Sequence, residues 1–144
     1  MTTKYEGDSE LMAQDGETLL NTLMPDAIED LQKNQEVLPR AAVVTEDGEI
    51  KLIEAPEDLE VAPEKAFGAL CDTIRKGPYR AAGLCFDIHF VREDLDQRSD
   101  AVRVYLETRD GAAMNVFLPY EQPEGGEVKT GEIFATEGKA RIFT

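Results

Sequence analysis

The chain has 144 residues, of which 42% are hydrophobic and 31% are charged, so it is expected to fold as one domain without a disulfide or metal to stabilise it. Thirty acidic residues against 15 Lys and Arg give a net charge of -15. A field of that sign repels phosphate, which argues against nucleic acid and anionic membranes as partners.

The negative charge is concentrated in residues 1–62, which hold 16 acidic and four basic residues. Two interpretations remain open: a surface that keeps the protein in solution, or a surface that meets a basic protein partner. The start of the chain lacks the apolar region of a signal peptide, and the longest apolar run, residues 81–86, is too short to cross a membrane. We therefore expect a cytoplasmic protein.

The two cysteines, Cys71 and Cys85, form neither a CxxC pair nor a metal-binding pattern. Two buried thiols in a reducing compartment are the favoured interpretation, and a disulfide between them stays open. A single histidine, with no Cys or carboxylate at ligand spacing, does not make a zinc site. The sequence predicts neither a metal nor a cofactor.

The first half of the chain predicts a helix followed by a hairpin. Residues 1–14 are expected to be flexible or weakly ordered, and residues 15–144 to form the single domain. Apolar residues at helical spacing predict a helix from Asp15 to about Gln35, kinked at Pro25. Residues 41–45 and 49–54 then flank a turn in which Gly48 takes the left-handed conformation, which pairs Val44 with Ile50 and Ala42 with Leu52.

The second half predicts a helix and then strands. A helix begins at Pro63 and ends before the pair Gly77-Pro78. Strands follow over residues 84–91 and around 102–107, and a turn at Gly111 returns the chain. This turn pairs three apolar positions with three others: Leu106 with Met114, Val104 with Val116, and Val102 with Leu118. A further edge strand over 127–136 and a short closing segment over 141–143 complete the chain.

The element order is helix, two strands, helix and three or more strands. Successive strands with few helices indicate an α+β domain with an antiparallel sheet. We expect two layers in αββαβββ order, with the helices packed mainly on one face of the sheet. This order is similar to that of profilin-like and roadblock proteins, a likeness at the level of the fold that says little about function.

Polar residues lie on one side of two consecutive predicted strands. Asp87 and His89 share a side of the first, and Arg103 and Tyr105 share the outward side of the next. A histidine near a carboxylate, an arginine and a tyrosine can bind an anion or move a proton. Charge pairs between strands on a solvated sheet face explain the same residues without a ligand.

Apolar residues are also expected on the sheet face away from the helices. They are Val91, Tyr105 and Phe117, together with Val43 and Ile53. If this face is bare, it predicts a homodimer or a partner interface. The alternative is that a terminal segment of the same chain covers it.

Three stretches carry a resemblance to a group of small bacterial proteins whose function is uncharacterised. They are residues 38–44 running into Asp47-Gly48-Glu49, residues 100–104 with residues 107–111, and the segment Val116-Phe117-Leu118-Pro119-Tyr120. The resemblance spans roughly residues 20–143 and implies a helix leading into a first hairpin, with a late hairpin that ends in the aromatic-proline segment. It implies no activity and no site residues.

No catalytic triad, phosphate loop or nucleophile motif is present in the sequence. The sequence therefore favours a non-enzymatic protein-interaction module, such as an adaptor, a chaperone-like protein or a toxin-neutralising protein. The alternative is a small-molecule or anion binder, or an enzyme, that uses the polar sheet face around His89.

Overall fold

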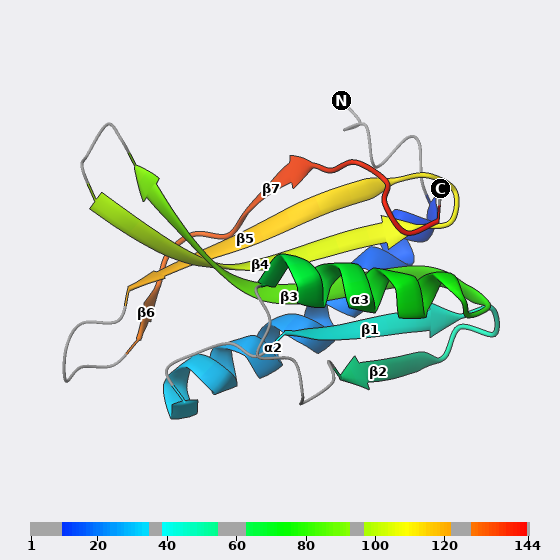
Figure 1. Ribbon diagram of the computed structural model, residues 1–144, viewed down its shortest axis with the longest axis horizontal. Coiled ribbons are helices and arrows are strands. Elements are labelled where there is room, and N and C mark those ends of the chain that lie inside the picture. The colour runs from blue at the N-terminus through cyan, green and yellow to red at the C-terminus, as the bar shows by residue number, and fades with distance from the viewer. Residues whose placement is uncertain (1–9, 35–38, 55–62, 93–96, 122–127, 144) are drawn as a thin grey trace.

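The computed structural model describes residues 10–34, 39–54, 63–92, 97–121 and 128–143. Two long helices and an antiparallel sheet make up the domain, so the predicted α+β class is confirmed (Figure 1). The elements are η1 (Met12–Gly16), α2 (Glu17–Asn34), β1 (Arg40–Thr45), β2 (Ile50–Glu54), α3 (Pro63–Arg75), β3 (Tyr79–Arg92), β4 (Gln97–Thr108), β5 (Ala113–Glu121), β6 (Lys129–Thr130) and β7 (Phe134–Glu137).

The strands are ordered β2-β1-β3-β4-β5-β6, and β7 pairs with β5. Both predicted hairpin registers are confirmed: Val44 lies opposite Ile50, and Val104 lies opposite Val116. Each depends on a glycine in the left-handed region, because Gly48 has φ 88° and Gly111 has φ 97°. Other residues adopt these angles at a cost, so the turns fix the pairing.

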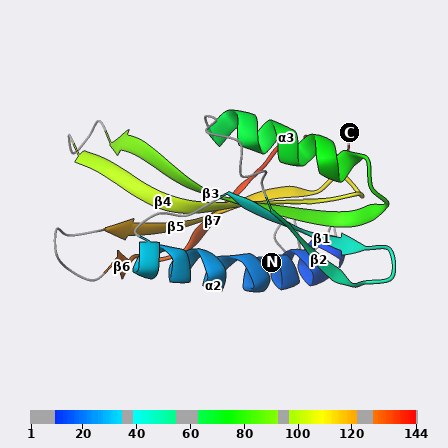
Figure 2. The ribbon, with the colours of Figure 1, turned by 60° about the horizontal axis from the view of Figure 1, so that its bottom comes forward.

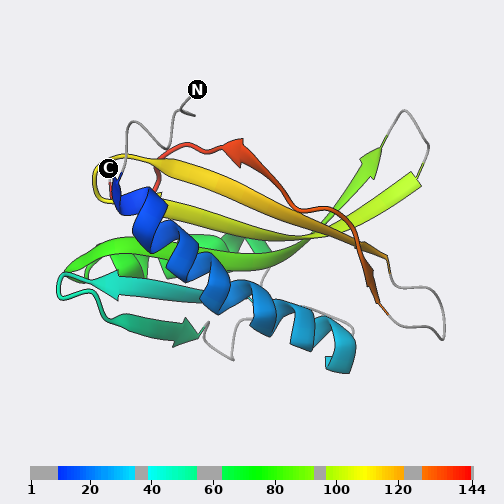
Figure 3. The same ribbon diagram turned by 180° about the vertical axis from the view of Figure 1, so that it is seen from behind.

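Helix α2 covers one face of the sheet along most of its length (Figure 3). Its apolar stripe, which includes Leu19, Leu23 and Leu31, packs on strand residues such as Val104. Gly83 on β3 lets the helix come close, since a Cβ there would lie 2.9 Å from Leu23 Cδ1. This face holds the larger of the two cores.

Helix α3 lies on the opposite face, where Leu70, Cys71 and Ile74 pack on β1 and β3 (Figure 2). In this respect the structure differs from the expected two-layer packing with the helices mainly on one face. The physical reason lies in the strands: both alternate sets of residues 41–44 and 81–86 are buried. Strands that are apolar on both sides need a cover on both sides.

The first helix begins earlier than the sequence predicted. Residues 10–14 are already helical and Met12 is buried, whereas residues 1–9 lie outside the described residues. Buried Asp15 accepts hydrogen bonds from Arg80 Nε at 2.8 Å and from Arg80 Nη2 at 3.0 Å. This forked ion pair fixes the start of the helix on β3. Pro25 lies inside α2, as expected.

The C-terminal part of the chain returns across the sheet. The predicted edge strand over 127–136 consists of two short strands, β6 and β7, both paired with β5. Beyond β7, the chain crosses toward α3 and ends beside it (Figure 1). Ile142 is fully buried in the core beneath α3. Within the described residues, no helix is both long and apolar enough to cross a membrane.

Candidate functional site

The four residues of the predicted polar constellation do not share a face. Asp87 lies opposite Val102, on the α2 side, and its Oδ1 accepts a hydrogen bond from the Tyr120 hydroxyl at 2.5 Å. Arg103 lies opposite Phe86, on the α3 side. The side chain of His89 lies outside the described side chains.

The separation follows from the register of β3 and β4. The predicted constellation requires Asp87 and Arg103 on one face, but the register pairs Leu84 with Tyr105 and Cys85 with Val104. A shift of one residue moves every side chain to the other face. Arg103 and Tyr105 are therefore brought together, and Asp87 is separated from them by the sheet.

The predicted interface residues have different surroundings. Tyr105 is 1% exposed beneath α3 and the C-terminal segment, so it makes its contacts within the chain. Phe117 is half-buried and stacks on Phe134 of β7, with ring centroids 5.0 Å apart. The side chain of Val91 lies outside the described side chains. Helix α3 and the C-terminal segment thus cover Tyr105, and β7 contacts Phe117.

Arg103 is a half-buried residue of β4 that lies next to Phe67 of α3 and Tyr105. Its Nε donates a hydrogen bond to Asn115 Oδ1 at 3.0 Å. Its guanidinium carbon lies 5.7 Å from the centroid of the Phe67 ring and 5.8 Å from that of the Tyr105 ring. Phe67, in the first turns of α3, stacks on Tyr105 at 5.6 Å. Two aromatic faces thus hold the cation in place.

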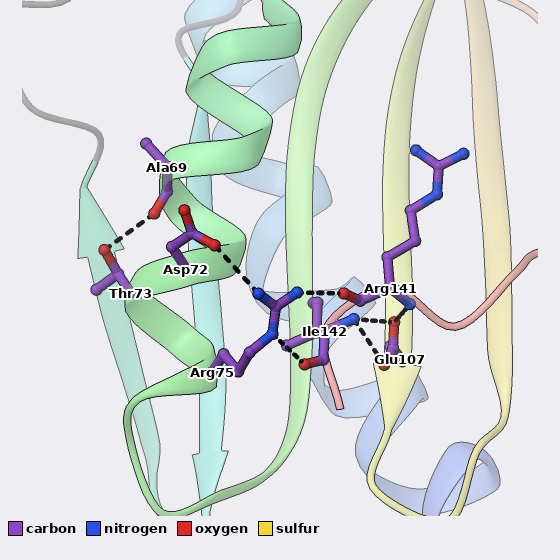
Figure 4. A network of polar contacts seen from close by, with 7 residues as sticks. All are labelled: Ala69, Asp72, Thr73, Arg75, Glu107, Arg141 and Ile142. Atoms are coloured by element: carbon purple, nitrogen blue, oxygen red, sulfur yellow. Dashed lines mark hydrogen bonds and ion pairs between the residues drawn. The ribbon is translucent and has the colours of Figure 1, made fainter. Parts of the chain in front are cut away.

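Arg141 reaches the same phenylalanine from the C-terminal segment. Its guanidinium carbon lies 5.8 Å from the Phe67 centroid. Its main-chain N–H donates a hydrogen bond to the carboxylate of Glu107 at 2.6 Å. The side chain of Arg141 extends away from this carboxylate (Figure 4). We call Phe67, Arg103, Tyr105, Asn115 and Arg141 the arginine–aromatic site.

The scaffold beneath Arg141 is a buried carboxylate. Glu107 is 0% exposed and also accepts the N–H groups of Ile142, at 3.0 Å, and Phe143, at 2.7 Å. The Tyr105 hydroxyl is placed to donate its single hydrogen either to Glu107 or to the Lys139 carbonyl, which is 2.5 Å away. Several charge-assisted bonds are what make a buried carboxylate tolerable.

Arg75 of α3 also binds the C-terminal segment, through the carbonyl groups of its main chain (Figure 4). Its Nε donates to the Ile142 carbonyl at 3.0 Å, and its Nη2 donates to the Arg141 carbonyl at 2.7 Å. Its Nη1 donates to Asp72 at 3.2 Å, which orients the fork. The backbone that carries Arg141 is therefore fixed to both the sheet and the helix.

The two arginines of the site have no acidic partner in the described part of the chain. The ion pairs found there involve Arg40, Arg75, Arg80 and Lys33, and neither Arg103 nor Arg141. Burial lowers the pKa of Arg103, and the positive charge of Arg141 lowers it further. An anion bound beside both guanidiniums would favour the charged form of Arg103 and so oppose both effects.

Sequence reasoning found part of this site and missed the rest. Arg103 and Tyr105 were candidates, and Asn115 lies opposite Tyr105, as the hairpin register implies. Phe67 looked like one more member of the apolar stripe of its helix, and Arg141 like part of a closing segment. Their juxtaposition has no local sequence signal, because they lie 74 positions apart in the chain.

The thiols have no role at this site. Cys71 lies on the sheet-facing side of α3, whereas Cys85 lies in the core on the α2 side. Burial raises the pKa of Cys71 to about 11 and that of Cys85 to about 12, so both are protonated at neutral pH. Among the described residues, no group of three or more His, Cys, Asp and Glu is arranged to hold a metal ion.

No protein-family model, no curated protein and no solved structure matches this chain.

Proposed function

We propose that this protein is a non-enzymatic protein-interaction module whose arginine–aromatic site holds an isolated anionic group of its partner. One observation carries the proposal: Arg103 and Arg141 converge on the ring of Phe67, and neither forms an ion pair within the described part of the chain. Arginine and tyrosine are enriched among the residues that contribute most to binding at protein interfaces, and arginine is favoured for ion pairs there.

The composition of the chain supports an isolated anion rather than a polyanion. A net charge of -15 repels nucleic acid and other polyanions at long range. At short range, the half-buried guanidinium of Arg103, with the exposed Arg141 on the same phenylalanine, attracts one carboxylate or phosphate strongly. The proposed ligand group is therefore a single charge presented by an otherwise uncharged or basic surface.

The direct test uses the arginine Nε–Hε signals in an NMR titration. Sodium acetate and inorganic phosphate are added separately at constant ionic strength. We expect the signals of Arg103 and Arg141 to move together and to saturate. Arg109 is the matched control, because it also lies over an aromatic ring, Phe143 at 5.5 Å, but outside the site. Equal, unsaturable shifts of all three arginines would contradict the proposal.

The partner itself is sought with matched variants. Wild type, the double variant Arg103→Ala with Arg141→Ala, and Arg109→Ala are immobilised and exposed to native lysate. We expect proteins retained by wild type and Arg109→Ala to be lost from the double variant and to be eluted by acetate. Retention of the same proteins by all three would contradict a role for the site in partner binding.

A further inference from the structure

Apolar side chains continue the arginine–aromatic site across the sheet. Arg103 on β4 lies directly opposite Phe117 on β5, and Phe117 lies directly opposite Phe134 on β7. Paired residues in an antiparallel sheet point to the same face, so the three form one row. Phe134 is 48% exposed and the neighbouring Ile133 is 51% exposed. The row thus passes from a half-buried cation to an exposed aromatic ring.

We infer that the ligand is a segment of a partner protein that carries an acidic residue and a large apolar residue two or three positions apart. This inference rests on the proposed function. The carboxylate lies between Arg103 and Arg141, and the apolar side chain packs on the exposed ring of Phe134.

The number of positions between the two peptide residues follows from the distance between the strands of the sheet. Neighbouring strands lie about 4.8 Å apart, so Arg103 and Phe134 are separated by about 10 Å across β5. An extended peptide rises about 3.1 to 3.4 Å per residue, and long side chains cover the remainder. An acidic residue and an apolar residue that are two or three positions apart can therefore reach the cation and the ring.

Charge complementarity selects a peptide carboxylate as the occupant. The surrounding protein is strongly acidic, so it repels a segment with many negative charges much more than a segment with one carboxylate beside an apolar residue. The row can be reached by a peptide, because Phe134 is exposed at one end and the exposed Arg141 belongs to the arginine–aromatic site at the other. Burial of the apolar side chain then adds affinity that a free anion lacks.

The test is a set of four capped peptides titrated by calorimetry against the whole protein. They have the form acetyl-Gly-X-Ser-Ser-Z-Gly-amide, in which X is Glu or Gln and Z is Phe or Ala. We expect the Glu/Phe peptide to bind about tenfold more tightly than the Glu/Ala and Gln/Phe peptides. Acetate should compete with it.

Two protein variants localise the apolar contact. Phe134→Ser should abolish the advantage of the Phe peptide over the Ala peptide, and it should leave the acetate-induced shifts of Arg103 unchanged. Leu52→Ser is the matched control, because Leu52 is 60% exposed on β2, on the other side of the sheet. It should change neither measurement.

The outcomes separate this inference from the proposed function. If acetate and the Glu/Ala peptide bind at Arg103 but the Phe residue adds nothing, the peptide inference is wrong and the anion site stands. If 3-phenylpropionate binds as tightly as the Glu/Phe peptide, the occupant is a small aromatic acid and the peptide inference is again wrong. If no anion saturates the arginine signals, both proposals are wrong.

Discussion

The carboxylate of Glu107 holds the main-chain N–H of Ile142 with both of its oxygens, each at 3.0 Å. This contact joins the middle of the sheet to the last described residues of the chain. It buries Ile142 beneath α3 and places the preceding residue, Arg141, over Phe67. The C-terminal segment is therefore part of the core and of the arginine–aromatic site.

Removing the carboxylate should release this segment. Glu107→Ala leaves the N–H groups of residues 141–143 without their acceptor, and we expect the free energy of unfolding to fall by roughly 2–4 kcal/mol. Glu107→Gln keeps one acceptor oxygen and should lose about half as much. Chemical denaturation measures the change, and amide hydrogen exchange at residues 141–143 reports the release. Unchanged protection of these amides in Glu107→Ala would contradict the role of the carboxylate.

Arg75 should affect anion binding without touching the anion. Arg75→Lys keeps a positive charge but loses the fork that holds two carbonyls, so Arg141 should be placed less well. We expect weaker acetate binding at Arg103 and Arg141 in the NMR titration. Asp72→Asn is the control, since its amide oxygen can still accept the bond from Arg75 Nη1, and both bonds from Arg75 to the segment are kept. Equal acetate affinity in wild type and Arg75→Lys would be the contrary result.

Two glycines should respond to alanine with opposite signs. At Gly83 a Cβ would lie 2.9 Å from Leu23 Cδ1 and 3.1 Å from Leu106 Cδ2, so Gly83→Ala should force these two buried side chains to shift in the core beneath α2. Overpacking of this kind costs roughly 1–3 kcal/mol. Gly68 lies in α3 with nothing within 4 Å of the added carbon, so Gly68→Ala should stabilise by up to about 1 kcal/mol. Thermal unfolding of both variants measures the contrast.

Phe117→Asp should lower the melting temperature of the protein. The ring stacks on Phe134 and lies in a half-buried row between β4 and β7, so an aspartate there loses apolar contacts and loosens β7. Phe117→Leu is the control and should lose much less. Sedimentation at high concentration decides between this and a dimer contact: a wild-type dimer that Phe117→Asp converts to a folded monomer of equal stability would contradict the intramolecular role.

The buried thiols predict a loss of stability in alkali. Because burial raises the pKa of Cys85 from 9.0 to about 12, the folded state keeps a proton that the unfolded state releases. The stability is therefore fully present below pH 9 and falls as the pH rises toward 12. Cys71 and Tyr105, whose pKa values are also raised mainly by burial, act in the same direction. Denaturant midpoints of wild type and Cys85→Ala at pH 7 to 10.5 check this, and the variant should fall less steeply.

The sequence by itself determined the elements and the local pairings. The turn glycines, Gly48 and Gly111, and the alternation of apolar residues around them specify both hairpins, because the conformation of a turn fixes the register of its strands. The stripe of α2 and the boundaries of α3 likewise follow from local spacing. In the site, Arg103, Tyr105 and Asn115 were already visible as neighbours on one hairpin.

Only the tertiary structure decided how the two faces are covered and which residues meet across them. The sequence between β3 and β4 has no glycine that would specify a turn and hence the register, and the observed register places Asp87 and Arg103 on opposite sides of the sheet. Phe67 and Arg141 come to Arg103 from a helix and from the last residues of the chain, through packing on Tyr105 and bonds to Glu107. Contacts between distant segments depend on the summed burial of both cores, which no local pattern encodes.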